Sequence, residues 1–202
     1  MRNLRTLFND AVTYGVAEAN WYPFKKFEMP SEEPVKLALP VKDLRIIRDF
    51  PAEEFCQRYL DVFMLSFYLI GINIGDLLLL RPTDMVGGRI EFSRQKTKKR
   101  YSIKVEPEAQ EIINRWRGKK YLLCFMDERA DYRSFLKMMN KHLKEFGRVE
   151  VDKARWGKKT KTGLYPFLRS YYARDTWATL ASVLDLSLIH ISEPTRPISI
   201  SY

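Results

Sequence analysis

The sequence predicts a mainly α-helical domain that carries one small antiparallel β-hairpin, an α+β arrangement. Three observations lead to this prediction. Apolar residues recur at spacings of three and four over most of the chain, which is typical of helices with one buried face. Residues 87–105 instead alternate apolar and polar positions on both sides of a basic stretch, as the strands of a hairpin do. Hydrophobic residues make up 46% of the chain, which supports a sizeable core and excludes an intrinsically disordered protein.

The N-terminal region predicts a helix followed by a linker. Residues 3–18 place Leu4, Leu7 and Ala11 on one helical face. This helix begins almost at the first residue, so we expect residues 1–20 to be the end of an incomplete helical domain. Residues 21–40 contain four prolines and a charged stretch, which is typical of an extended linker.

From residue 41 the pattern becomes that of a folded domain, which we expect to extend to residue 186. The strands of the hairpin pair Ile90 and Phe92 with the segment from Tyr101 to Val105, and the tip is basic. Residues 148–168 show no helical period and are expected to form a basic loop. Helices are expected from Asp43, from about Ala52, and over residues 60–72, 107–117, 131–146 and 170–184. The last of these is expected to bury Ala173, Trp177, Leu180, Ala181 and Leu184.

Composition narrows the classes of function. Lys plus Arg is 35 and Asp plus Glu is 25, so the net charge is 35 − 25 = +10. A positive field of this size attracts polyanions, of which nucleic acid is the commonest. Anionic membranes, acidic proteins and a merely solvated basic surface are the alternatives. Two cysteines and two histidines are too few for a disulfide framework or a four-ligand zinc site, so we expect no metal, no cofactor and a reducing, cytoplasmic location.

One segment could be taken for a membrane span. Val62 to Leu80 offers 14 uncharged residues before Asp76, and polar residues and glycines already interrupt them. A span needs about 20 apolar residues, so a buried helix is the expected structure and no membrane partner is expected.

Three side chains are candidates for chemistry on a phosphate. Tyr171 and Arg174 are three residues apart on the first turn of the last helix, where a guanidinium can bind a phosphate bidentately near the helix N-terminus. Lys96 lies in the basic stretch of the hairpin, where neighbouring positive charges are expected to make its ammonium group release a proton more readily. Ready release of a proton is what a lysine needs to act as a general acid. The plainer alternatives are an arginine paired with a carboxylate such as Asp175 and a solvated lysine. The surrounding cations, which we expect to contact nucleic acid, are Arg94, Lys98, Lys99 and Arg100.

Four segments together resemble the tyrosine recombinase (phage integrase) family, particularly integrases of mobile genetic elements. They are FMLSFYLIGINIGDLLLL, GRIEFSRQKTKKRYSIKV, EPEAQEIINRW and SYYARDTWATLA. The likeness runs from the first residue to about Leu186, and the last segment matches the His-x-x-Arg helix of the family. The resemblance implies a tyrosine recombinase catalytic domain over residues 41–186, preceded by the last helix of a core-binding domain over residues 1–20.

The resemblance also implies a function, which is site-specific breakage and rejoining of double-stranded DNA. A tyrosine attacks the scissile phosphate and becomes linked to the 3′ end, while a general acid protonates the leaving 5′ hydroxyl. Arg174 matches the second arginine of the family and Lys96 matches the hairpin lysine that serves as the acid. No metal is required, because arginines and the lysine neutralise the transition state. Full-length members assemble as homo-oligomers on DNA.

Departures from the family pattern bear on activity. The first arginine of the family falls on Asn73, which can donate a hydrogen bond but carries no charge. Tyr171 replaces the usual histidine, and Asp175 replaces the second histidine. Asp175 would repel a phosphate if it faced the site, and the plainer alternative is that it points away. After Leu186 the sequence SLIHISEPTRPISISY contains no Leu-Gly-His segment and no helix before Tyr202. It resembles a translated sequencing adapter, so we expect residues 187–202 to be non-native and the nucleophilic tyrosine to be missing from this fragment.

Two other functions remain open at this stage. A degenerate integrase that occupies DNA without catalysis is favoured by Asn73 and Asp175. A basic RNA-binding or assembly protein would bind RNA tightly and show no preference for DNA.

Overall fold

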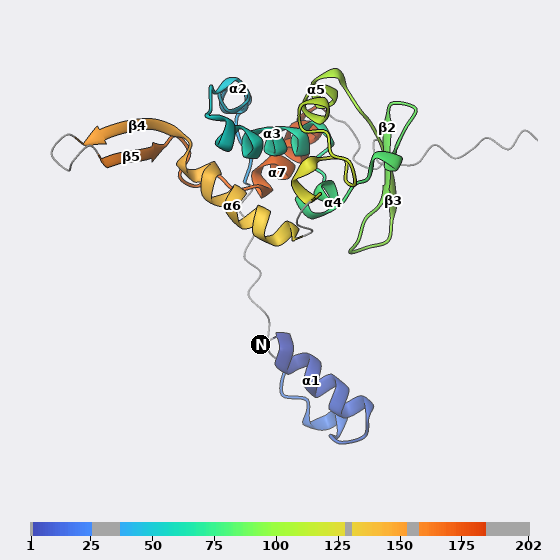
Figure 1. The fold of residues 1–202 in the computed structure, drawn as a ribbon. Coiled ribbons are helices and arrows are strands. Elements are labelled where there is room, and N and C mark those ends of the chain that lie inside the picture. The colour runs from blue at the N-terminus through green and yellow to red at the C-terminus, as the bar shows by residue number, and fades with distance from the viewer. Residues whose placement is uncertain (1, 26–36, 128–130, 153–157, 185–202) are drawn as a thin grey trace, which may run out of the picture. The chain divides into compact units, whose positions relative to one another are not determined.

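The computed structural model describes residues 2–25, 37–127, 131–152 and 158–184, with the side chains of Arg2 and of residues 148–152 and 158–162 left aside (Figure 1). The chain divides into two units, Met1–Val35 and Lys36–Tyr202.

In the first unit a short segment folds back on one helix. Helix α1 (Arg2–Thr13) is followed by the 3-10 turn η1 (Ala19–Trp21). The rings of Phe8, Tyr22 and Phe24 lie with their centroids within 6.3 Å of one another, and Arg5 Nε donates a hydrogen bond to the Tyr22 hydroxyl at 2.7 Å. The helix therefore ends earlier than expected, because the chain must turn back to bring Tyr22 onto Phe8.

The second unit is mainly helical, as predicted. Its helices are α2 (Val41–Asp49), α3 (Glu54–Tyr68), α4 (Ile74–Leu78), α5 (Pro107–Arg115), α6 (Tyr132–Glu145) and α7 (Tyr171–Val183), with 3-10 turns η2 (Pro82–Asp84) and η3 (Cys124–Met126).

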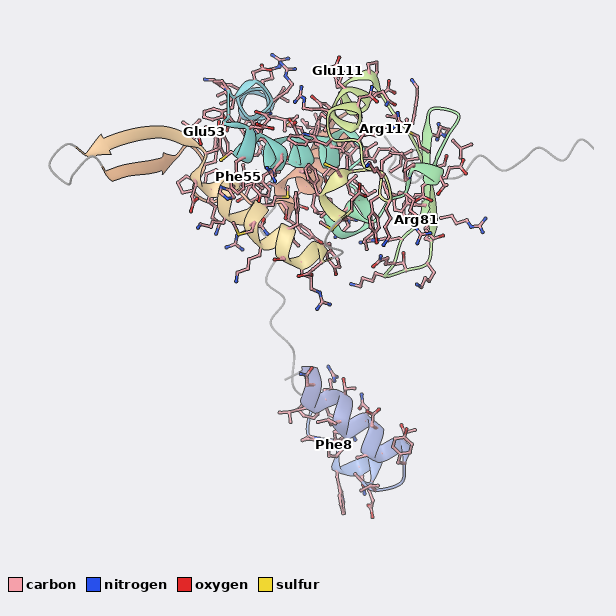
Figure 2. The ribbon with its side chains drawn as sticks, in the orientation of Figure 1. Phe8, Glu53, Phe55, Arg81, Glu111 and Arg117 are labelled. Carbon is pink, nitrogen blue, oxygen red and sulfur yellow. The ribbon has the colours of Figure 1, made fainter. Side chains whose placement is uncertain are left out.

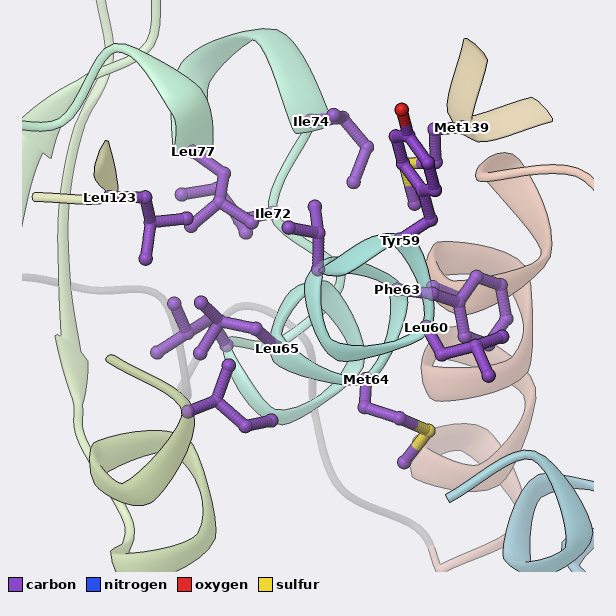
Figure 3. Packing of buried hydrophobic residues seen from close by; sticks show 14 of the residues in the cluster. Tyr59, Leu60, Phe63, Met64, Leu65, Ile72, Ile74, Leu77, Leu123 and Met139 are labelled. Carbon is purple, nitrogen blue, oxygen red and sulfur yellow. The ribbon is translucent and has the colours of Figure 1, made fainter. Parts of the chain in front are cut away.

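Helix α3 lies at the centre of this unit. Its residues from Tyr59 to Ser66 are all buried, and α2, α4, α5, α6 and α7 pack around it. Figure 3 shows Phe63 and Leu65 pointing to opposite sides of α3, so the helix has apolar neighbours on more than one face. The apolar run is thus a core helix. Among the helices of the described residues, none is long and apolar enough to cross a membrane.

The sequence had predicted two helices where α3 is one. The segments from about Ala52 and over 60–72 merge because no breaker separates them, and the surrounding helices bury the part from Tyr59 to Ser66. The helix ends at Tyr68 because Ile70 and Gly71 adopt positive φ angles of 61° and 67°.

The predicted hairpin is present and has one further strand. Strands β1 (Met85–Val86), β2 (Arg89–Ser93) and β3 (Arg100–Lys104) form an antiparallel sheet in that order. Ile90 pairs with Ile103 and Phe92 with Tyr101. Ile90 and Ile103 are buried in the helical core, which fixes the register, since a shift of one residue would expose both.

Residues 148–168 are not a loop throughout, which corrects the expectation from the sequence. Strand β4 (Gly147–Asp152) pairs antiparallel with β5 (Lys158–Gly163) in a second, two-stranded sheet. Figure 1 shows this hairpin extending away from the end of α6. Mostly polar residues form it, so apolar patterning gave little sign of it.

Helix α7 buries less than the sequence predicted. Ala173 and Ala181 are buried as expected, whereas Trp177 and Leu180 are half-buried and Leu184 is exposed. Leu184 follows the last helical residue. Trp177 instead lines a cavity at the surface of the unit.

Candidate functional site

A cavity of about 220 Å³ opens where three distant parts of the second unit meet. They are the loop between α3 and α4, the end of the β2–β3 hairpin, and the first two turns of α7. The residues that line it are Leu69, Ile70, Gly71, Ile72, Asn73, Asp76, Phe92, Arg94, Tyr101, Ile103, Arg174, Trp177 and Ala178.

The loop between α3 and α4 is held tightly against α7. Gly71 donates its N–H to Ser66 O at 2.9 Å, and Ser66 Oγ donates to Ile72 O at 2.7 Å. A Cβ atom built on Gly71 would lie 2.9 Å from Cα and 3.0 Å from Cγ of Arg174. The absence of a side chain at position 71 therefore allows the backbone of the loop to approach the base of Arg174.

Two further hydrogen bonds fix α7. The buried hydroxyl of Thr176 accepts the Leu39 N–H at 2.9 Å, which joins α7 to the segment before α2. At the start of the helix, Ser170 donates its N–H to Asn140 Oδ1 on α6 at 2.8 Å. Arg174 is thus carried by a helix that is fixed at its N-terminus and on its buried face.

Arg174 makes no ion pair with any carboxylate among the described residues. Its half-buried side chain lines the cavity and makes no ion pair or side-chain hydrogen bond there. The alternative that it pairs with a carboxylate such as Asp175 is therefore not seen within the described ranges, and Asp175 is not among the lining residues. A half-buried guanidinium with unused donors is suited to binding an external anion.

Asp76 attaches the end of the hairpin to α4. Its side chain is 9% exposed, and Oδ1 accepts the Gln95 N–H at 3.2 Å while Oδ2 lies 4.0 Å from Arg94 Nε. Within the turn, the Arg94 N–H donates to Lys99 O at 2.9 Å and the Lys98 N–H donates to Arg94 O at 2.8 Å. These contacts fix the main chain on both sides of Lys96.

The structure brings some of the predicted site residues together and leaves others outside the cavity. Arg174, Asn73 and Arg94 line it. Lys96 is exposed in the turn held by Asp76, and Tyr171 is 55% exposed at the first position of α7; neither is a lining residue.

The remaining cations of the hairpin lie at its exposed end. Lys98 is exposed, and Lys99 Nζ lies 5.9 Å from the centre of the Tyr101 ring. Arg100 lines a separate open groove together with Asp84 and Glu91.

Asn73 has a structural role that the sequence had not revealed. It is the N-cap of α4, and its Oδ1 accepts the Gly75 N–H at 2.9 Å. Asparagine is among the best N-cap residues because its side-chain oxygen satisfies an N–H that the helix leaves free. The amide NH₂ is the part of this exposed side chain left for a ligand.

A second cluster of reactive side chains lies elsewhere in the unit. Cys56 Sγ is 3.8 Å from His142 Nδ1, and Glu145 Oε2 is 4.0 Å from the same nitrogen. The His142 ring stacks on Tyr59 and meets Phe55 edge to face (Figure 2 labels Phe55 near α6). Within the described parts of the chain, no group of three such residues could hold a metal ion. His142 is half-buried, at the boundary of the core.

The unit consists of helices packed around a central α3 and a three-stranded sheet, and the end of the hairpin lines a cavity together with α7. This is the fold of a tyrosine recombinase catalytic domain. Solved structures identify this fold. A lambda integrase dimer bound to a COC′ core site matches with a TM-score of 0.63 at 13% sequence identity, over 96% of this chain and 69% of that chain. The Tn1549 transposon integrase in complex with circular intermediate DNA matches with a TM-score of 0.57 at 14% identity, over 94% of this chain and 67% of that chain.

A second structure of the Tn1549 integrase, in complex with transposon right end DNA, matches with a TM-score of 0.62 at 14% identity, over 96% of this chain and 70% of that chain. No family model and no curated protein matches the sequence. The similarity therefore establishes the fold, and the resemblance predicted from the four sequence segments is confirmed at that level.

Two lining residues were not expected to line a cavity. Arg94 was predicted to be a DNA contact on the hairpin, and Trp177 was predicted to be in the core. Trp177 gave no signal beyond its helical spacing. Arg94 could have been noticed as the residue where the strand ends and the basic turn begins.

Proposed function

We propose that this chain binds double-stranded DNA and belongs to the machinery of a site-specific recombinase that breaks and rejoins DNA through a phosphotyrosine intermediate. The observation that carries the proposal is the cavity in which Arg174 of α7 and Arg94 of the hairpin meet, with no carboxylate bound to Arg174 among the described residues. The net charge of +10 supports a polyanionic partner. The matched integrase structures contain DNA, and the lambda structure is a dimer, which supports DNA as the ligand and assembly of copies on it.

In this proposal the residues divide the work on one phosphodiester. Arg174 donates to two non-bridging oxygens of the phosphate, because its fork matches their spacing. Lys96 protonates the 5′ oxygen as the bond between phosphorus and that oxygen breaks. Tyr171 donates its phenolic hydrogen to a phosphate oxygen. Lys98, Lys99, Arg100 and Arg94 neutralise phosphates of the backbone nearby.

DNA affinity at several salt concentrations tests the binding part of the proposal. The protein should bind a random-sequence duplex, and log K should fall linearly with log salt because phosphate contacts release counterions. Arg174→Gln should weaken binding by about tenfold, the loss expected for charge-assisted hydrogen bonds. Arg48→Gln on α2 is the matched control: it removes the same charge from an exposed side chain whose partner is the adjacent Asp49. Affinity that ignores salt, or equal effects of the two variants, would contradict the proposal.

Strand cleavage tests the chemical part. We propose that the nucleophilic tyrosine is not among these residues, so a suicide substrate should yield no covalent adduct with the protein. Hydrogen peroxide can act as the replacement nucleophile: its oxygen attacks phosphorus, the bond to the 5′ oxygen breaks, and Lys96 supplies the proton. Duplexes enriched from a random pool by binding should be nicked when peroxide is added, and Lys96→Ala should abolish the nicking without abolishing binding.

The second candidate function is DNA binding without catalysis, and the N-cap role of Asn73 favours it. A neutral side chain whose oxygen caps α4 supplies no positive charge at the position of the first arginine of the family. This candidate predicts the same DNA affinity and salt dependence, but no nicking of any enriched duplex under peroxide. RNA bound more tightly than DNA of the same length would contradict both candidates.

A further inference from the structure

We propose that Arg94 is the second phosphate-binding guanidinium of the cavity and supplies the positive charge that Asn73 does not. This inference rests on the proposed function, since it takes the ligand of the cavity to be a DNA phosphodiester. It moves Arg94 from the general set of DNA contacts on the hairpin to a defined place in the cavity that Arg174 also lines.

The charges that line the cavity require such a residue. Asp76, Arg94 and Arg174 are its charged lining residues. Without Arg94 the remaining carboxylate and guanidinium would cancel, and the cavity would hold no net attraction for a phosphate. With Arg94 the lining carries a net charge of one positive unit, from two guanidinium groups and one carboxylate.

Arg94 also has donors left for a ligand. Its charged partner among the described residues is Asp76, and the Nε–Oδ2 separation of 4.0 Å is at the outer limit of an ion pair. The carboxylate uses its other oxygen to accept the Gln95 N–H. The two terminal nitrogens of Arg94 make no hydrogen bond within the described ranges, so they can donate to phosphate oxygens.

The main chain of Arg94 is fixed by the turn. Its main chain makes two hydrogen bonds across the turn, to Lys98 and Lys99, and its side chain is 23% exposed. The main chain that carries this guanidinium therefore needs no reordering when a ligand binds, which is one advantage of a preorganised site.

Anisotropy measurements with a fluorescent random-sequence duplex test the inference, using the whole chain. Arg94→Gln should weaken binding by about tenfold, as expected for charge-assisted hydrogen bonds to phosphate. The control Arg48→Gln should weaken it by less than about twofold, since an exposed charge away from the contact is screened. The double variant Arg94→Gln/Arg174→Gln should lose less than the product of the two single losses, because residues that share one ligand are coupled.

A rescue experiment locates the effect in the cavity. In the Arg94→Gln protein, Asn73→Arg should recover most of the lost affinity. Asn73→Ala in the same protein is the matched control, because it loses the same N-cap without gaining a charge. Restoration by arginine and not by alanine supports the proposal. No restoration, or an equal gain when Asn73→Arg is made in the wild-type protein, overturns it.

Folding of the variants needs a separate measurement. Arg94→Gln leaves the Asp76 carboxylate without its charged partner, which could itself disturb the fold. The Asp76→Asn variant is therefore compared with the double variant Asp76→Asn/Arg94→Gln, since neither contains an unpaired carboxylate at position 76. Circular dichroism measures the helix content of each variant. A loss of DNA affinity on adding Arg94→Gln in this background supports the inference. If the wild-type protein binds DNA but Arg94→Gln matches Arg48→Gln in both backgrounds, the inference fails and the proposed function stands. If the wild-type protein binds no DNA, the proposed function fails and takes the inference with it.

Discussion

Replacing Gly71 by alanine should both destabilise the protein and disturb Arg174. Gly71 has a φ of 67°, in the left-handed region where an L-residue with a Cβ pays about 1–2 kcal/mol. The new Cβ would lie 2.9 Å from Cα of Arg174, a backbone atom that cannot swing aside. Overpacking of this kind costs about 1–3 kcal/mol. We therefore expect Gly71→Ala to lower the free energy of unfolding by about 2–5 kcal/mol, a large share of the roughly 5–15 kcal/mol of a typical domain.

Gly88→Ala is the control that separates the two costs. Gly88 has a similar φ of 74°, and a Cβ built on it meets no atom within 4 Å. This variant should therefore lose only the conformational part, and the lower entropy of the unfolded chain affects both variants alike. The difference between the two, measured by urea unfolding, is the cost of separating the loop from α7.

DNA affinity under conditions where Gly71→Ala remains folded completes the test. A shift of the loop against α7 moves the base of Arg174, so the affinity of this variant should fall towards that of Arg174→Gln, while Gly88→Ala should bind as the wild-type protein does. Equal unfolding free energies for the two alanine variants would refute the close packing of the loop on α7.

Three further substitutions have expected outcomes. Asn73→Ala should destabilise the protein by about 0.5–2 kcal/mol through loss of the cap on Gly75, and unchanged urea unfolding would show that α4 does not depend on it. Thr176→Val keeps the shape of a buried side chain but leaves the Leu39 N–H without its acceptor. The free energy of unfolding, measured with urea, should therefore fall by about 1–3 kcal/mol. A change no larger than that of a substitution at an exposed position would contradict the role of this bond. Backbone N–H groups, first that of Lys119, hold the pKa of the Asp127 carboxyl below its ordinary value, so its stabilising effect is present above that value and is lost as pH falls through the folded pKa. The gap in thermal midpoint between the wild-type protein and Asp127→Asn should therefore be widest near neutral pH and close below about pH 4, and a gap that persists in acid would contradict this.

The sequence predicts the β2–β3 hairpin well because the constraint is local. Ile90 and Ile103 each stand in an alternating pattern, and both are buried, so the pattern and the packing agree. The boundaries of α3 are harder to predict for the opposite reason. A helix that is apolar on nearly every face has no period of its own, and its end is set by the turn at Ile70 and Gly71 that packs on α7.

The second hairpin was missed because its strands carry little apolar signal. Strands β4 and β5 contain mainly charged residues and threonines, and in these two strands only Val149 and Val151 give an apolar alternation, over a stretch that is otherwise basic and polar. The pairing of β4 with β5 depends on backbone hydrogen bonds, which cannot be inferred from the side chains in the sequence.

That Arg174 and Arg94 line one cavity could be predicted from the sequence only in part. The place of Arg174 on the last helix predicts a phosphate-binding residue, and in the structure Arg174 lines the cavity. Arg94 reaches the same cavity because the Asp76 carboxylate on α4 accepts the N–H of Gln95 and so holds the hairpin against α4. Asp76 lies nineteen residues before Gln95 in the chain. No local pattern reports a contact of that range, so the sequence could identify Arg94 as a cation of the hairpin but not as a residue of the cavity.

Asn73 shows why a missing charge in a motif cannot be interpreted from the motif alone. Taken alone, the residue is a lost arginine, and the plain conclusion is a weakened site. In the structure the same asparagine caps α4, the helix whose Asp76 fixes the hairpin and with it Arg94. An asparagine cap stabilises the start of that helix by an amount that an arginine, with no side-chain acceptor, could not supply. Asn73 thus contributes no charge of its own to the cavity, but it stabilises the helix that holds Arg94 in place. This exchange predicts that Asn73→Arg in the wild-type protein should lower stability even where it adds a phosphate contact.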